Sequence, residues 1–184
     1  MRPTDILKKE HDAILLMLGV IEKVCDKLEF GEIVNPQHLE QIVEFIQVFA
    51  DKCHHGKEEE LLFVEMNKAG FPKEAGPIAV MLQEHELGRS FVRQMAEASR
   101  DYSLGKPGSG KKFEDNARGY VALLQQHISK ENNILFPLAD SHIPENVQER
   151  LLTDFEKVES EKIGAGKHEE LHKVIDSLKN FYLK

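Results

Sequence analysis

Two short segments of this sequence pair a histidine with a glutamate four residues later. His54 precedes Glu58 and His127 precedes Glu131 by this spacing, which places both side chains of each pair on one face of a helix. Imidazole nitrogens and carboxylate oxygens together are ligands that suit iron, manganese or zinc. Two carboxylates that can bridge favour a dinuclear site with ions ~3.5–4 Å apart, for which iron is the first choice.

The two segments also repeat each other. Residues 54–63 align without gaps on residues 127–136, so that histidine, lysine, glutamate, leucine and phenylalanine recur at the same places. This register makes Glu58, rather than Glu59, the equivalent of Glu131. It also selects His54, rather than its neighbour His55, as the equivalent of His127.

Two further histidines, His11 and His85, complete the candidate set. His11 is followed on its apolar stripe by Ile14, and His85 follows Met81 on another, so both should point inward if these stretches are helical. Burying imidazoles and carboxylates together costs several kcal/mol for each uncompensated charge. Metal ions that accept their lone pairs would remove this cost, so the pattern indicates a metal site.

The spacing of apolar residues predicts the helices that must position this site. A period near 3.6 recurs along most of the chain, and no useful stretch alternates with a period of two. Capping and breaking residues divide the pattern. Four long helices are predicted, over Thr4 to Gly31, Pro36 to Gly70, Lys73 or Pro77 to a connector at Gly105–Gly110, and Phe113 to Ala139. A fifth helix begins after Pro144. Gly164 and Gly166 interrupt it, and it resumes over Lys167–Leu183.

We therefore expect an all-α protein, in which residues 1–142 form an antiparallel up-down four-helix bundle and residues 143–184 form a C-terminal helical extension packed on it. His11 and His54 lie 22 and 21 residues from a turn centred at residue 33. His85 and His127 lie 22 and 20 residues from one centred at residue 107. Differences of one or two residues amount to ~3 Å at 1.5 Å per residue, so the four histidines should meet in one layer.

Composition and charge exclude several classes of function. The net charge of -8 argues against a nucleic-acid partner, because phosphate binding needs a basic surface. Apolar runs are far shorter than the ~20 residues that span a bilayer, and no signal segment opens the chain, so we expect a cytoplasmic protein with no membrane partner. Cys25 and Cys53 form no Cys-x-x-Cys motif and are expected to be small buried residues.

At these residues the sequence resembles the hemerythrin-like, HHE cation-binding family over residues 5 to about 140. The motifs that carry the resemblance are Glu10-His11-Asp12, His54-x-x-x-Glu58-Glu59, Glu84-His85-Glu86 and His127-x-x-x-Glu131 followed by Leu135-Phe136-Pro137. The resemblance implies a non-haem di-iron centre with oxo or hydroxo and carboxylate bridges. It further implies that His11 and His54 bind one iron, that His85 and His127 bind the other, and that Glu58 and Glu131 bridge the two.

One departure from the family pattern concerns the second iron. Oxygen-carrying hemerythrins have a histidine four residues before the position of His85, where this sequence has Met81. His55 is the natural substitute, because it lies about 60° around a helix from Glu58 at 100° per residue. A role behind the ligands, or exposure to solvent, is the alternative for His55.

The resemblance implies that the protein binds a small diatomic ligand, O2 or NO, for sensing, storage or detoxification. A binding protein is favoured over an enzyme, because no separate acid, base or nucleophile is evident in the sequence. The enzyme alternative is a di-iron oxidoreductase, namely a peroxidase, ferroxidase or NO reductase. A third alternative is an iron-responsive interaction protein.

Overall fold

Four helical rods make up the first 142 residues of the computed structural model, which describes residues 1–184 and contains no strand. The first rod is α1 (Pro3–Glu29) and the third is α4 (Gly76–Ser103). The second joins α2 (Pro36–Phe45), the π-helical segments Ile46–His55 and Glu58–Leu62, and α3 (Phe63–Lys68). The fourth joins α5 (Ser109–Lys130), the π-helical segment Glu131–Leu135, and α6 (Phe136–His142).

The ends of these rods follow from capping residues. Asn35 accepts a hydrogen bond from the backbone N–H of Gln37 and is followed by Pro36 at the first helical position, which starts the second rod. The fourth rod begins at Ser109, four residues before the predicted start at Phe113. Gly108 takes a left-handed conformation with φ 78° and turns the chain directly into the helix, so the connector is shorter than the sequence indicated.

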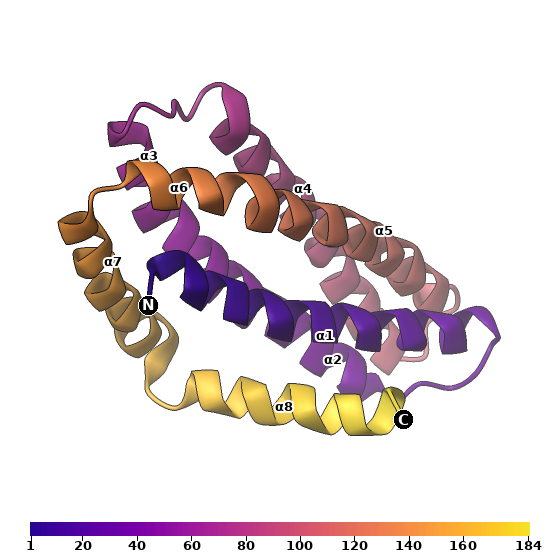
Figure 1. Cartoon of the computed structure of the whole chain (residues 1–184). Helices are drawn as coiled ribbons and strands as arrows, with labels where there is room; N and C mark the ends of the chain where they lie inside the picture. The colour runs from indigo at the N-terminus through magenta and orange to yellow at the C-terminus, as the bar shows by residue number, and fades with distance from the viewer.

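The rods lie side by side (Figure 1). α5 packs along both α1 and α4, and α4 packs along α2. The remaining residues form α7 (Glu145–Lys157), the π-helical segment Val158–Gly164, and α8 (Lys167–Tyr182), which runs along α1 and α2. None of the helices is both long and apolar enough to cross a membrane.

Two apolar clusters fill the interior, and a polar layer separates them along the rods. Along the second rod, Ala50 belongs to the larger cluster and Leu62 to the smaller. Along the fourth rod, Leu124 belongs to the larger cluster and Leu135 to the smaller. Each His-x-x-x-Glu pair lies between the two clusters. Cys25 and Cys53 are buried, as predicted, and burial raises the pKa of both thiols to about 12.

Residues 143–184 contribute to both apolar clusters. Leu151 and Phe155 of α7 join the smaller cluster, and Leu171, Ile175 and Leu178 of α8 join the larger one. The C-terminal residues therefore bury apolar surface together with the four rods, which is the main source of stabilisation for such a segment.

Candidate metal centre

The structure brings all seven residues of the predicted metal-binding set into one buried layer. No member is more than 5% exposed, and both glutamates are completely buried. The members are His11, His54, His55, Glu58, His85, His127 and Glu131. They come from all four rods, so the matched distances along the helices that the sequence indicated are realised.

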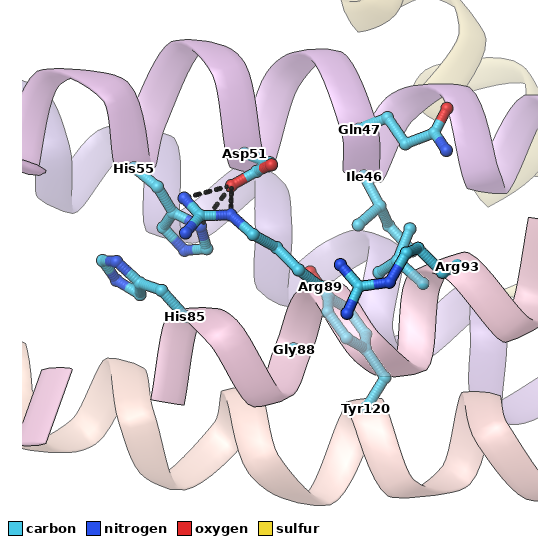
Figure 2. A pocket seen from close by; sticks show the side chains of 10 residues that line it. Ile46, Gln47, Asp51, His55, His85, Gly88, Arg89, Arg93 and Tyr120 are labelled. Carbon is cyan, nitrogen blue, oxygen red and sulfur yellow. Dashed lines mark hydrogen bonds and ion pairs between the residues drawn. The ribbon is translucent and has the colours of Figure 1, made fainter. Parts of the chain in front are cut away.

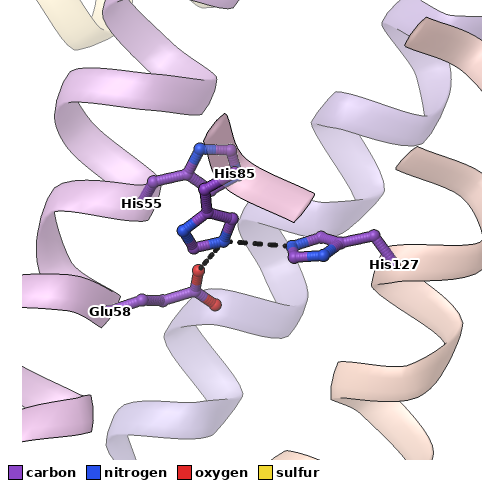
Figure 3. A group of neighbouring side chains, drawn as sticks. All are labelled: His55, Glu58, His85 and His127. Carbon is purple, nitrogen blue, oxygen red and sulfur yellow. Dashed lines mark hydrogen bonds and ion pairs between the residues drawn. The ribbon is translucent and has the colours of Figure 1, made fainter. Parts of the chain in front are cut away.

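The ligand atoms of these residues form two groups that share one carboxylate. His11, His54, Glu58 and Glu131 make up the first group. His55, Glu58, His85 and His127 make up the second, which Figure 3 shows converging from three rods. Within each group the donor atoms lie within 4.8 Å of one another, close enough to surround a single ion.

Each carboxylate lies between a histidine of the first group and a histidine of the second. Glu58 has Oε1 3.4 Å from Nε2 of His54 and Oε2 3.4 Å from Nε2 of His85. Glu131 has Oε2 3.1 Å from Nε2 of His11 and Oε1 3.1 Å from Nε2 of His127. One oxygen therefore faces each group, as a carboxylate bridging two ions requires.

All five imidazoles are held in the same way, through Nδ1. The partners are Asn132 for His11 at 2.8 Å, Glu10 for His54 at 2.9 Å, Asp51 for His55 at 3.2 Å, Glu59 for His85 at 2.7 Å and Glu84 for His127 at 2.8 Å. Because a carboxylate or amide oxygen accepts, each Nδ1–H donates. Each Nε2 is thereby left with a lone pair that points into the site, the arrangement typical of histidine ligands to metals.

Seven of the nine donor atoms of the site have no hydrogen-bond partner. Nε2 of His11, His54 and His55 and all four carboxylate oxygens of Glu58 and Glu131 are buried without one. Such groups cost ~1–3 kcal/mol each when nothing satisfies them. The Nε2 atoms of His85 and His127 face each other at 3.1 Å, the spacing of two adjacent nitrogen ligands ~2.1 Å from one ion. The residues present therefore fit a pair of metal ions.

The acid–base properties of the site also favour cations. Burial and neighbouring imidazoles lower the pKa of His54 and His55 well below the usual range, so both are neutral ligands. Burial and the charge of Glu131 raise the pKa of Glu58 well above its usual range. Burial opposes ionisation of Glu131 as well, but His127 and His11 outweigh it and hold that pKa well below its usual range. The raised pKa of Glu58 means that a proton and a metal ion compete for this carboxyl group.

The position of His55 follows from the π-helical form of the second rod. A π-helix has i→i+5 hydrogen bonds and therefore a wider turn than an α-helix. The segment Ile46–His55 has this form, and His54 and His55 both point into the layer, one to each group. Met81, at the position where oxygen carriers have a histidine, packs in the smaller apolar cluster instead.

The groups behind the ligands repeat between the two halves, a feature that the sequence prediction missed. Lys57 contacts Glu10, the partner of His54, and Lys130 contacts Glu84, the partner of His127. Glu59, which holds His85, and Asn132, which holds His11, also occupy equivalent places in the repeat. The matching lysines at positions 57 and 130 were the sequence signal for this second layer.

The other histidines lie outside the layer. Nδ1 of His38 is 2.7 Å from the hydroxyl of Tyr182, so this ring is bonded within the protein. His168 and His172 pack on Phe49, with ring centroids 5.1 and 5.4 Å away. His142 is exposed.

A pocket of about 180 Å³ opens beside the second group of ligands (Figure 2). His55 and His85 line one end, and Arg93 projects over it without an ion-pair partner. Arg89 donates to Asp51, and this bond together with the one from His55 outweighs burial and lowers the pKa of Asp51 to about 2. Tyr120 also lines the pocket; its side chain is 2% exposed and its hydroxyl has no hydrogen-bond partner.

Comparison with known proteins places the chain in a family. The model of the hemerythrin HHE cation binding domain matches residues 2–139. The uncharacterized protein Rv1995 of Mycobacterium tuberculosis is 24% identical over 136 residues, which are 73% of this chain and 52% of that protein. The iron-sulfur cluster repair protein YtfE of Salmonella typhimurium is 34% identical over 89 residues, 47% of this chain and 40% of its own.

The chain thus spans about half the length, or less, of the curated relatives that it matches. No solved structure matches it. The family match nevertheless covers most of the chain and contains all seven residues of the candidate centre. On this evidence the chain belongs to the hemerythrin HHE cation-binding family.

Proposed function

We propose that this chain binds two non-haem iron ions between its four rods, arranged as an antiparallel up-down bundle on which residues 143–184 pack as an extension. The ligands that we assign are His11 and His54 for the first ion, His55, His85 and His127 for the second, and Glu58 and Glu131 as bridges. The observation that carries this proposal is the buried layer of unpartnered lone pairs in two groups that share Glu58.

The donor set and the comparisons both support iron. Imidazole and carboxylate ligands without any thiolate suit iron among the common transition metals. YtfE is named for the repair of iron–sulfur clusters, which is consistent with iron chemistry in a relative of this chain.

A small diatomic ligand, O2 or NO, is the ligand that we propose for the first ion. When bound, a pair of ferrous ions supplies electrons and an open coordination position to such a ligand. The first ion has two histidines against three for the second, so the open position belongs to the first. Its surroundings are closed: His11 stacks on Phe136 with centroids 5.4 Å apart, and Ile14 and Leu135 are at most 2% exposed. A closed apolar surrounding admits a small neutral molecule and excludes water, which favours sensing, storage or detoxification.

One observation favours the oxidoreductase alternative. The pocket beside the second ion is lined by polar groups, namely Tyr120, Arg89 and Asp51, and it reaches His55. If His55 left the second ion, a small polar substrate such as peroxide would have a route to it through this pocket. Reversible binding of NO or O2 without turnover supports the first function, and steady consumption of peroxide supports the second.

Metal content tests the proposal most directly. Protein purified from iron-supplied cells is expected to hold about two irons per chain, and His54→Ala and Glu131→Ala should each lose metal. His142→Ala and Glu156→Ala are matched controls at exposed positions and should keep both ions. Two irons retained in both site variants would refute the ligand assignment.

A further inference from the structure

Four of the five imidazoles have a carboxylate partner at Nδ1 that a cation contacts in turn, and three cations serve them. Lys57 contacts Glu10 behind His54, and Lys130 contacts Glu84 behind His127. Arg89 contacts both Glu59 behind His85 and Asp51 behind His55. The side chains of Arg89 and Lys130 are 27% and 39% exposed, so water solvates part of each charge. The side chain of Lys57 is 0% exposed. Lys57 is therefore the one cation of the three whose charge is compensated by protein groups alone, without solvation by water.

The cover over Lys57 comes from the C-terminal residues. Oε1 of Glu159 lies 2.6 Å from the Lys57 ammonium, and the Phe155 ring centroid lies 5.6 Å from it. Both residues lie beyond the family match, which ends at residue 139. The equivalent lysine of the repeat, Lys130, has no such cover. The C-terminal residues thus make the two halves of the centre unequal.

Glu10 connects this buried lysine to a metal ligand. One of its oxygens, Oε1, contacts Lys57 and the other, Oε2, accepts from Nδ1–H of His54. A buried ammonium with one carboxylate partner retains much of its desolvation cost, and the second carboxylate, Glu159, offsets it. Without Glu159, the Lys57 ammonium would have Glu10 as its only carboxylate partner and would draw more of the charge of Glu10 toward itself. Glu10 would then polarise His54 less, and His54 would be a weaker ligand.

Glu10, Glu159 and His168 lie close enough together to be considered a third cation site. The ammonium of Lys57 already contacts both of these carboxylates, so their charge is compensated without a metal. The trio is better explained as the pairing of a buried lysine than as a metal site.

We propose that Glu159 is a positioning residue for the first metal ion, acting through Lys57 and Glu10 on His54, so that residues 143–184 form a functional part of the centre. This inference rests on the proposed function, because it requires a metal ion at His54. It predicts an effect on one ion only, since the chain of contacts from Glu159 leads to His54.

Titration of the metal-free full-length protein with Co2+ under nitrogen, followed by visible absorption, tests this proposal. We expect Glu159→Gln to weaken one of the two binding steps ~10–100-fold, the effect typical of removing a group behind a ligand, and to leave the other unchanged. Glu161→Gln is the matched control, because it makes the same charge change at an exposed position two residues away. It should titrate like the wild type.

A double variant separates positioning from general loosening of the fold. If Glu159 acts through Glu10, adding Glu159→Gln to Glu10→Gln should weaken the affected step no further, since the two changes interrupt one chain. Equal weakening of both steps, multiplied effects in the double variant, or a Glu159→Gln titration like that of Glu161→Gln would each overturn the proposal. A wild-type protein that takes up no metal would instead refute the proposed function, and this inference with it.

Discussion

Among the five buried histidines, His55 is held least closely. Its Nδ1 lies 3.2 Å from Asp51, against 2.7–2.9 Å for the other four, and Asp51 also accepts from Arg89. Because Asp51 also pairs with Arg89, less hydrogen-bonding free energy is lost when His55 moves away from a metal ion. His55 also lines the pocket, so we assign any exchange of ligands at the second ion to this residue.

Removing the His55 imidazole should therefore weaken binding of the second ion. We expect His55→Ala to lose iron to a chelator that leaves the second ion of the wild type in place, because only the imidazoles of His85 and His127 would remain there, as few as at the first ion. Iron analysis after gel filtration measures this, with His142→Ala as an exposed histidine control. A His55→Ala protein that retains two irons against this chelator would remove His55 from the ligand set.

Tyr120 offers a second test at the scale of one residue. Its buried hydroxyl has no partner, so Tyr120→Phe removes a polar atom that costs ~1 kcal/mol and should raise the free energy of unfolding of the metal-free protein by about that amount. Tyr182→Phe should do the opposite, because that hydroxyl is bonded to His38. Urea unfolding curves of the two variants provide the comparison, and loss of stability in Tyr120→Phe would contradict it.

At the scale of the helix, the π-helical segments could not be predicted from the sequence. The pattern of apolar residues is compatible with α-helical and π-helical turns alike over so few residues, and a rotation of 100° per residue describes only the α form. Three of the four segments, Ile46–His55, Glu58–Leu62 and Glu131–Leu135, lie in the two rods that carry the His-x-x-x-Glu pairs. The seven ligand candidates nevertheless lie together, because residues one helical turn apart share a face in both forms.

Close packing of α4 on α5 depends on a glycine. A Cβ at Gly119 would lie 2.6 Å from the Phe91 ring, whereas a Cβ at Gly19 in α1 would make only ordinary contact with Leu183 at 3.7 Å. Alanine favours a helix over glycine by ~1 kcal/mol at either place. We expect Gly19→Ala to stabilise the protein by about that amount, and Gly119→Ala to fall short of it by ~1–3 kcal/mol because of overpacking. Thermal unfolding measures the difference, and equal gains would contradict the close approach.

For the molecule as a whole, contacts between residues far apart in the sequence could not be predicted. Short-range spacing and capping residues were sufficient to identify the rods and to bring the ligands to one level. The contacts of Lys57 join it to residues 47 and 102 positions away, and no local pattern encodes such a pairing. The involvement of the C-terminal residues in the centre was for this reason visible only in the structure.

The metal-free protein should lose stability as the pH rises through the folded-state pKa of Glu58. Burial raises that pKa above its ordinary value near 4.5, so the neutral carboxyl stabilises the fold at low pH and this contribution disappears at higher pH. The side chain introduced by Glu58→Gln cannot ionise. Between pH 4.5 and the raised folded-state pKa, the free energy of unfolding of this variant relative to the wild type should therefore rise by ~1.4 kcal/mol per pH unit. Urea unfolding between pH 4 and 8 measures this, with the exposed Glu40→Gln as control. A constant difference would contradict the raised pKa.

Positions 55 and 128 are equivalent in the internal repeat, yet one carries an imidazole in the metal layer and the other an isoleucine that is 3% exposed in the larger apolar cluster. With the ions assigned as proposed, this single difference gives the two metal sites unequal affinity for iron. When iron is scarce, the site with three histidines fills first. The site with two histidines, which has the open coordination position, fills last. Occupancy of the ligand-binding ion then follows the supply of iron, so the response of the protein to a diatomic gas would depend on how well the cell is provided with metal.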